Sequence, residues 1–347
     1  MTSPSFRLRL AFALCFPCVA LSCKPSAAPE EQPEQAAVVD AIQRLGGRVE
    51  VDEGMPGRPV VKVSLMLKNL RDEDLQVLSR LPRLRVLYLD ANPLTDEGLH
   101  HLTGLSDLEN LNLGGTDVSD DGLKTLSKLS SLQRLVLSGT KVQGEKLGEL
   151  RVLKNLRSLD LSLSPLTDQG LANLRGFPRL DDLSAAKTSL SDAGLVHLKH
   201  LEQLQRLFLD GTKVTDDGLA HLVALRKLEA LGLGGTKVTD AGLARLKTLP
   251  NLRGLHLDGT TVSDAGLSHL EAVQSLERLG LEGTRVTDKG LPHLQNMKKL
   301  RRVILQDTAV TGEGAKALRE ARPKLEIILR ETKEQAEIRQ LLEKFRK

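Results

Sequence analysis

The feature that most constrains this chain is a 24-residue unit that recurs ten times between residues 81 and 320, with no insertion or deletion. Its template can be written LxxLxxLxLxGTxVTDxGLxxLxx. The copies begin at Leu81, Leu105, Leu129, Leu153, Phe177, Leu201, Leu225, Leu249, Val273 and Met297. A fixed period of this length is typical of solenoids, in which each unit forms one coil that packs only against its neighbours. Ten coils leave little of the 347-residue chain for another domain.

The composition fits a layered stack better than a globule. Hydrophobic residues make up 40% of the chain, but aromatic residues only 2%, with no Trp and a single Tyr. The core must therefore be built almost wholly from Leu, Val and Ala. The three cysteines, Cys15, Cys18 and Cys23, all precede the repeats, so disulfides cannot cross-link the coils.

Each unit contains two different apolar periods. The alternation in Leu207-Phe208-Leu209-Asp210 has period two and predicts a short strand with the leucines inward. The spacing of Leu219 and Leu222 after Thr215 is helical, and Thr is a good N-cap. We therefore predict an α/β fold, a curved solenoid with a parallel β-sheet on the concave face and short α-helices on the convex face. The strands should be centred on Leu87, Leu111, Leu135, Leu159, Leu183, Leu207, Leu231, Leu255, Leu279 and Val303.

Two polar columns recur at the ends of the strands and at the starts of the helices. A Thr, replaced once by Asn92 and once by Ser164, follows each strand and can bond the backbone where the chain turns. An Asp column that includes Asp192 and Asp216 is interpreted as charge at the helix start. The third copy departs from the template with KVQGEKLGEL, so its helix is expected to be distorted.

The residues outside the repeats suggest two caps and an exported N-terminus. Residues 38–80 are predicted to form an N-terminal cap, with a short helix from Val38 and strands at 48–52 and 60–67. Residues 321–347 should supply a closing strand at 325–329 and a charged amphipathic helix. Residues 23–37, rich in Pro, Ala and Glu, are predicted to be a disordered linker.

Residues 1–22 are predicted to be a signal peptide. Arg7 and Arg9 precede an apolar run of about 12 residues, which is too short to span a bilayer. Leu21-Ser22-Cys23 resembles the end of a bacterial lipobox, although Ala20 and Leu21 depart from its usual residues. The resemblance implies that Cys23 is lipidated and becomes the mature N-terminus. The alternatives are a plain signal peptide, giving a secreted or periplasmic protein, or a short uncleaved anchor.

The motifs GTKVTDDGLAHL and GTKVTDAGLARL resemble bacterial leucine-rich repeats with a Thr-Asp-x-Gly-Leu helix start, of the planctomycete-like kind. The leader IQRLGGRVEVDE is also similar to the segment that often precedes them. The resemblance covers about residues 38–330. It implies a horseshoe used for recognition of a protein or another ligand, and it does not specify the partner.

The sequence gives little support to other functions. Without Arg7 and Arg9, 47 basic residues face 45 acidic ones, which offers no electrostatic case for nucleic acid. The chain contains no Gly-rich phosphate loop, GxSxG or HExxH motif, so we expect no enzyme and no cofactor. Five histidines share one repeat position, but helices about 10 Å apart are too distant to share a zinc ion, so we expect no metal site there. These are His101, His197, His221, His269 and His293.

The concave strand positions hold the candidate ligand site. In the C-terminal half, the outward position next to the centre of each predicted strand alternates between a large residue and glycine. His256, for example, lies between Gly232 and Gly280 of the adjacent strands. The predicted notch is a recess with an aromatic anchor and arginines, as in protein-binding hot spots. It comprises Arg206, Phe208, Asp210, His256, Asp258, Arg278 and Glu282. The alternative is that these charges only pair across strands and that the glycines have no role.

Two functional hypotheses follow. The favoured one is a non-catalytic scaffold, anchored in the cell envelope through its lipid, that binds a protein or peptidic ligand on the concave face. The other is a structural envelope component without a discrete ligand. A catalytic function is disfavoured because no nucleophile accompanies His256 and Asp258.

Overall fold

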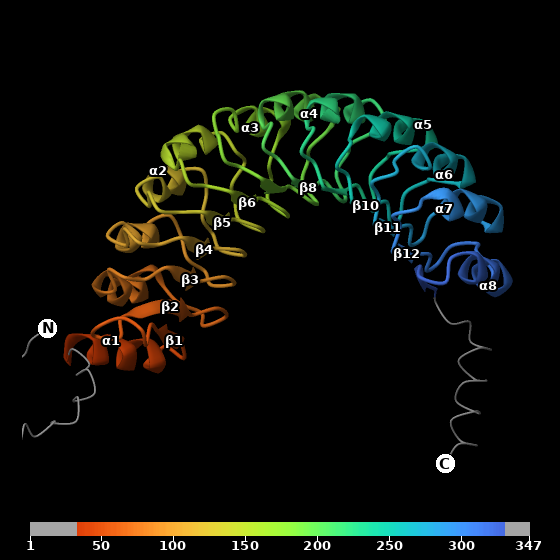
Figure 1. Ribbon diagram of the computed structural model, residues 1–347. Helices are drawn as coiled ribbons and strands as arrows, with labels where there is room; N and C mark the ends of the chain where they lie inside the picture. The colour runs from red at the N-terminus through yellow and green to blue at the C-terminus, as the bar shows by residue number, and fades with distance from the viewer. Residues whose placement is uncertain (1–32, 330–347) are drawn as a thin grey trace, which may run out of the picture.

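The structure is a computed structural model that describes residues 33–329. The chain winds into an arch with the strands along its inner side and the short helices along its outer side (Figure 1). Within the described range one sheet contains 13 strands in sequence order, β1 to β13. Their bounds are Arg48–Val51 (β1), Val60–Ser64 (β2), Val86–Tyr88 (β3), Asn110–Asn112 (β4), Arg134–Val136 (β5), Ser158–Asp160 (β6), Asp182–Ser184 (β7), Arg206–Phe208 (β8), Ala230–Gly232 (β9), Gly254–His256 (β10), Arg278–Gly280 (β11), Arg302–Ile304 (β12) and Glu326–Ile328 (β13).

The repeat sets both the position and the register of the strands. All ten strands from β3 to β12 are centred on the predicted residues. Each pairs in parallel with the residues 24 positions further along, so that Leu183 faces Leu207 and Leu207 faces Leu231. The leucines at these centres are at most 1% exposed. The predicted curved solenoid with a concave parallel sheet is therefore confirmed.

The outer layer consists of short segments, and many of them are 3-10 helices where α-helices were predicted. They are α1 (Pro33–Arg44), η1 (Asp72–Arg80), η2 (Gly98–Leu102), α2 (Gly122–Leu126), η3 (Leu147–Val152), α3 (Asp168–Ala172), α4 (Asp192–Leu195), η4 (Val196–His200), η5 (Gly218–Ala224), α5 (Asp240–Leu243), η6 (Ala244–Thr248), α6 (Asp264–Leu270), η7 (Asp288–Gly290), α7 (Leu291–Asn296) and α8 (Gly312–Ala321). A 3-10 helix suits such short pieces, because a single turn gains little from the costly nucleation of an α-helix.

The N-terminal cap extends the sheet beyond the first repeat. Strand β1 pairs antiparallel with β2, which in turn pairs in parallel with β3. Helix α1 packs Val38 and Ile42 into the core and begins at Pro33, five residues before the predicted start. Residues 33–37, expected to be linker, are therefore helical. Pro at the first helical position and an acidic residue in the first turn, here Glu34, both favour a helix start at this point.

The segments at the two ends of the chain fall mostly outside the described residues. These include the predicted signal peptide, Cys23 and the charged C-terminal helix. The closing strand is present as β13, which pairs in parallel with β12. Among the described residues, no helix combines the length and the apolar character needed to cross a membrane.

The predicted threonine column stabilises the turn after each strand. In each of nine coils the Thr or Ser hydroxyl donates to the backbone carbonyl three residues earlier, at 2.6 to 2.7 Å. These bonds lie within a coil. Asn92 instead joins two coils, because its side chain accepts from the N–H of Lys68 and Leu70 and donates to the carbonyls of Leu65 and Leu89.

The Asp column joins neighbouring coils, which corrects its interpretation as helix-start charge alone. Asp192 accepts from both the backbone N–H and the hydroxyl of Thr215, which belongs to the next coil. The same pair of bonds recurs at eight places in the described residues. The pattern fails in the third coil, where Gly144 occupies the Asp position and the N–H of Thr167 bonds the carbonyl of Gln143. The distortion expected there is present, since η3 begins only at Leu147.

Candidate ligand-binding site

The notch lies on the concave face, across strands β8 to β11. Phe208 and His256 stand on β8 and β10, with Gly232 of β9 between them. Their ring centroids are 6.3 Å apart and the rings are inclined by 39°. Phe208 is half-buried and His256 is exposed. The two rings thus form an aromatic platform over the strand that carries no side chain.

The glycines beside this platform leave less room than the sequence suggested. A Cβ atom at Gly232 would lie 2.2 Å from Oδ2 of Asp210 and 2.8 Å from Cδ1 of Phe208. A Cβ at Gly280 would lie 2.8 Å from Oδ1 of Asp258. Side chains of neighbouring residues therefore already cover both glycines, and a side chain at either position would have to displace them. At Gly254 the nearest atom to such a Cβ, Nη2 of Arg278, is 3.5 Å away, so this position is more open.

The two aspartates of the notch already have structural partners. Asp210 Oδ1 accepts from the N–H of Gly234 at 2.8 Å. Asp258 Oδ1 accepts from the N–H of Glu282, also at 2.8 Å. Both carboxylates thus fix the loop that follows the next strand.

The charged residues of the notch divide into two groups. Arg206 forms an ion pair with Asp182 of β7, 3.1 Å between Nη2 and Oδ2, on the side of β8 away from His256. Arg278 and Glu282 are exposed and lie on the β11 side. The structure therefore brings Phe208, His256 and Arg278 toward one surface, while Arg206 is engaged elsewhere.

The column of five histidines is less uniform than a row of solvent-facing residues. Only His269 is fully exposed, and Nδ1 of His197 is buried without a hydrogen-bond partner. Burial, and secondarily Arg175, holds the pKa of His197 below its usual range. His293 Nδ1 lies 2.8 Å from Oε2 of Glu271 in the previous coil. No group of three or more His, Cys, Asp or Glu side chains within residues 33–329 is arranged to hold a metal ion.

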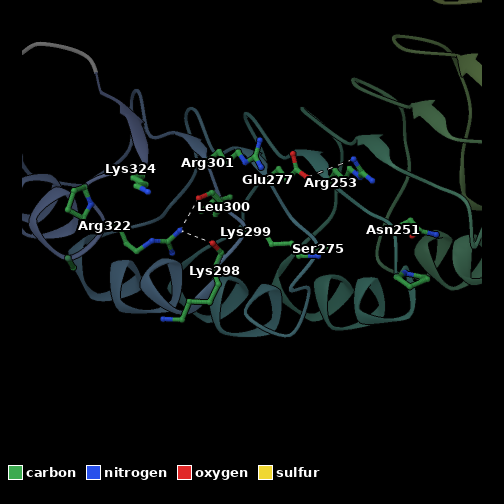
Figure 2. Close-up of a pocket in the computed structure, with 13 residues that line it drawn as sticks. Asn251, Arg253, Ser275, Glu277, Lys298, Lys299, Leu300, Arg301, Arg322 and Lys324 are labelled. Carbon is green, nitrogen blue, oxygen red and sulfur yellow. Dashed lines mark hydrogen bonds and ion pairs between the residues drawn. The ribbon is translucent and has the colours of Figure 1, made fainter.

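A second hollow was missed by the sequence analysis. It is a groove of about 860 Å³ on the flank of the last coils, where the chain passes from the outer helices into the strands (Figure 2). The signal that could have found it is the basic run Lys298-Lys299-Leu300-Arg301-Arg302, since the equivalent segments of other copies hold fewer charges of one sign. We call it the flank groove; its charged lining consists of Arg253, Glu277, Lys298, Lys299, Arg301, Arg322 and Lys324.

Comparisons with known proteins agree with this architecture. A family model described as "Leucine Rich repeat" matches residues 104–127 and 152–174. A comparison with curated protein sequences finds no match. Among solved structures, an internalin (inlF) from Listeria monocytogenes is 19% identical, with a TM-score of 0.57, over 89% of this chain and 98% of that one.

A mammalian structure is similar to the same degree. The mouse RP105/MD-1 complex is 20% identical, with a TM-score of 0.57, over 74% of this chain and 44% of that one. At such identities the likeness is one of fold. The 24-residue period, the curved parallel sheet and these two structures together identify the fold as a leucine-rich-repeat solenoid, and the family match agrees with it over the two segments that it covers.

Proposed function

We propose that this protein is a non-catalytic interaction scaffold whose concave face binds a protein or peptidic ligand at the notch. The observation that carries the proposal is the Phe208–His256 platform, a partly exposed aromatic surface across a strand that has only Gly232 between the rings. Exposed aromatic area beside arginine is typical of binding hot spots. Leucine-rich-repeat proteins generally act as interaction scaffolds, and the mouse neighbour was solved as a complex of RP105 with MD-1.

The platform also limits which chemical groups of a ligand could bind at the notch. Three charged residues of the notch already have partners in the protein. Asp210 and Asp258 accept backbone hydrogen bonds, and Arg206 forms an ion pair with Asp182. The ligand therefore meets mainly the two rings and the guanidinium of Arg278. A ligand segment with an apolar or aromatic side chain next to a carboxylate would suit this surface. The carboxylate would pair with the guanidinium of Arg278. The apolar side chain would pack against the two rings.

The test is chemical crosslinking and capture from the native envelope with the full chain, its Phe208→Ala variant and a Val136→Ala control. Val136 is also half-buried and faces outward on β5 of the same concave sheet. We expect one stoichiometric partner with the parent and the control. The binding free energy of that partner should weaken by about 2 kcal/mol in Phe208→Ala. Equal affinity in all three would contradict the proposal, and capture of this chain alone would favour the structural alternative.

A substitution at Gly232 is a poor test of the notch. A side chain there would displace Phe208 and Asp210 from where they lie, so it would change the platform and not simply fill it. His256→Ala is a cleaner companion to Phe208→Ala, because His256 is exposed and its register partners on both adjacent strands are glycines. Both variants should weaken the same partner.

We also propose that the protein is exported and anchored through a lipid on Cys23, which lies outside the described residues. Arg7, the short apolar run and Leu21-Ser22-Cys23 support this. Metabolic labelling with a fatty-acid analogue should mark the parent and a Cys18→Ser control. The label should be lost in Cys23→Ser, and its survival in that variant would contradict the lipid anchor.

A further inference from the structure

The flank groove is strongly basic and holds little that could neutralise it. Six of its lining residues carry a positive charge and one, Glu277, a negative charge. Glu277 Oε1 lies 4.0 Å from Nη1 of Arg253. Lys298, Lys299, Arg301 and Lys324 are all exposed, and Glu277 is the one carboxylate among the lining residues. Mutual repulsion of these charges would be relieved by an anionic ligand.

One cation fixes the shape of the groove. The guanidinium of Arg322 donates to the backbone carbonyls of Leu294, Gln295 and Met297 through Nη1, at 2.9 to 3.2 Å. Through Nη2 it donates to those of Lys298 and Leu300, at 2.9 to 3.3 Å. Figure 2 shows it reaching from the last coil to the segment that carries the lysines. The segment is thereby held in place before any ligand arrives, which reduces the entropy lost on binding.

The groove is elongated along the stack. Its lining comes from four successive turns, from Pro250 and Arg253 before β10 to Pro323 and Lys324 before β13. Adjacent strands are about 4.8 Å apart, so four of them span about 14 Å. About four residues of extended polypeptide cover that length at roughly 3.3 Å each. Pro250, Ala321 and Pro323 are exposed and add apolar surface between the charges.

We propose that the flank groove binds an extended acidic segment of a partner protein. The Lys and Arg side chains of the groove pair with the carboxylates of this segment, and the apolar residues of the groove pack against its aliphatic parts. Clusters of Arg and Lys are a recurrent means of recognising acidic motifs. The apolar share of the lining favours a peptide over a bare phosphate, which has no aliphatic part to cover it. The site is separate from the notch, on a different surface of the molecule, and does not depend on the function proposed for it.

The first experiment measures fluorescence anisotropy of a labelled octapeptide, GELEELEG, with the full 347-residue chain. The same peptide with Gln in place of every Glu is the matched control. We expect the acidic peptide to bind at least about tenfold more tightly, and its affinity to fall as salt screens the charges. Equal affinity for the two peptides would overturn the proposal.

The second experiment locates the site by charge reversal. Lys299→Glu with Arg301→Glu should weaken the acidic peptide about tenfold or more, since both side chains are exposed and line the groove. Lys124→Glu with Lys128→Glu makes the same change of charge on exposed residues of the second coil and should leave the affinity unchanged. An equal loss in both double variants would show attraction to overall charge, and would overturn the assignment to the groove.

Two further measurements separate this site from its alternatives. Phe208→Ala should not alter binding of the acidic peptide; a loss there, with none in the groove variant, would place the peptide at the notch and overturn the proposal. Inorganic tripolyphosphate is the second probe. Binding of tripolyphosphate without binding of the peptide would assign the groove to a phosphate ligand and would also overturn it. Thermal unfolding of each variant, followed by circular dichroism, confirms that the fold is retained.

Discussion

Asp192 accepts two hydrogen bonds from Thr215 of the next coil, one from the backbone N–H at 2.8 Å and one from the hydroxyl at 2.6 Å. Within the motif Thr-Asp-x-Gly-Leu, the Asp of one coil thus binds the Thr of the next. The Gly that follows that Thr by three residues leaves space for the carboxylate. A Cβ at Gly218 would lie 2.3 Å from Oδ1 of Asp192. The motif is therefore a connector between coils.

Removing one connector should destabilise the stack. Asp192→Ala removes the acceptor of both the N–H and the O–H of the half-buried Thr215, and we expect the free energy of unfolding to fall by about 2 kcal/mol. Urea denaturation gives the change. Asp217→Ala, at an exposed carboxylate whose only described ion pair is a 3.9 Å contact with Arg245, should change it by less than about 0.5 kcal/mol. Equal effects would contradict the connector role.

Gly218→Ala should be destabilising, although alanine favours helices over glycine by about 1 kcal/mol. The added Cβ would overlap the carboxylate of Asp192, and overpacking of this kind costs about 1 to 3 kcal/mol. The clash should disappear in the Asp192→Ala background. A double-mutant cycle by urea denaturation should therefore show coupling of at least about 1 kcal/mol, and additive effects would refute the proposed steric cause.

Leu163→Gly should stabilise the protein. Leu163 has φ +60° and is 61% exposed, whereas the equivalent residue of several other coils, such as Gly211 and Gly235, is glycine with a similar φ. The left-handed conformation costs an L-residue about 1 to 2 kcal/mol, part of which is offset by the greater freedom of glycine in the unfolded chain. We expect a gain of about 1 kcal/mol in thermal unfolding, and a loss of similar size for Gly235→Ala. A loss in Leu163→Gly would show that the exposed leucine makes a stabilising contact.

Glu271 should make stability depend on pH in the acid range. Its hydrogen bond with His293, and then the one donated by Asn296, holds the pKa of this carboxyl below the usual 4.5. A lowered pKa in the folded state contributes stability above the unfolded pKa, and that contribution is lost as the pH falls through the folded value. Glu271→Gln should therefore be less stable than the parent near pH 6, and the difference should shrink below about pH 4.

The matched control for this pH dependence is Glu202→Gln, at an exposed carboxylate of an earlier coil. Its unfolding midpoint in urea, compared with that of the parent, should show no corresponding change between the two pH values. A constant difference for Glu271→Gln across the range would contradict the proposed role of its ionised form.

The sequence by itself determined the strands and the core. The change from a period of two to a helical spacing occurs at one fixed place in every unit, so all ten strand centres from Leu87 to Val303 could be predicted. Burial of the leucines follows from the same local pattern, because residues of alternate parity must face opposite sides of a strand. The outward direction of Phe208 and His256 on the concave face follows in the same way.

Only the tertiary structure determined the contacts and hydrogen bonds between neighbouring coils. Stacking places residues 23 or 24 positions apart within hydrogen-bond distance, and this turns the Asp column into connectors and leans Asp210 over Gly232. It also gathers Arg253, Arg301 and Lys324 from separate turns into one groove. A linear pattern specifies which face a side chain takes. The distance between side chains on adjacent coils, and hence their bonds and the space left for a ligand, is set by the approach of the packed backbones.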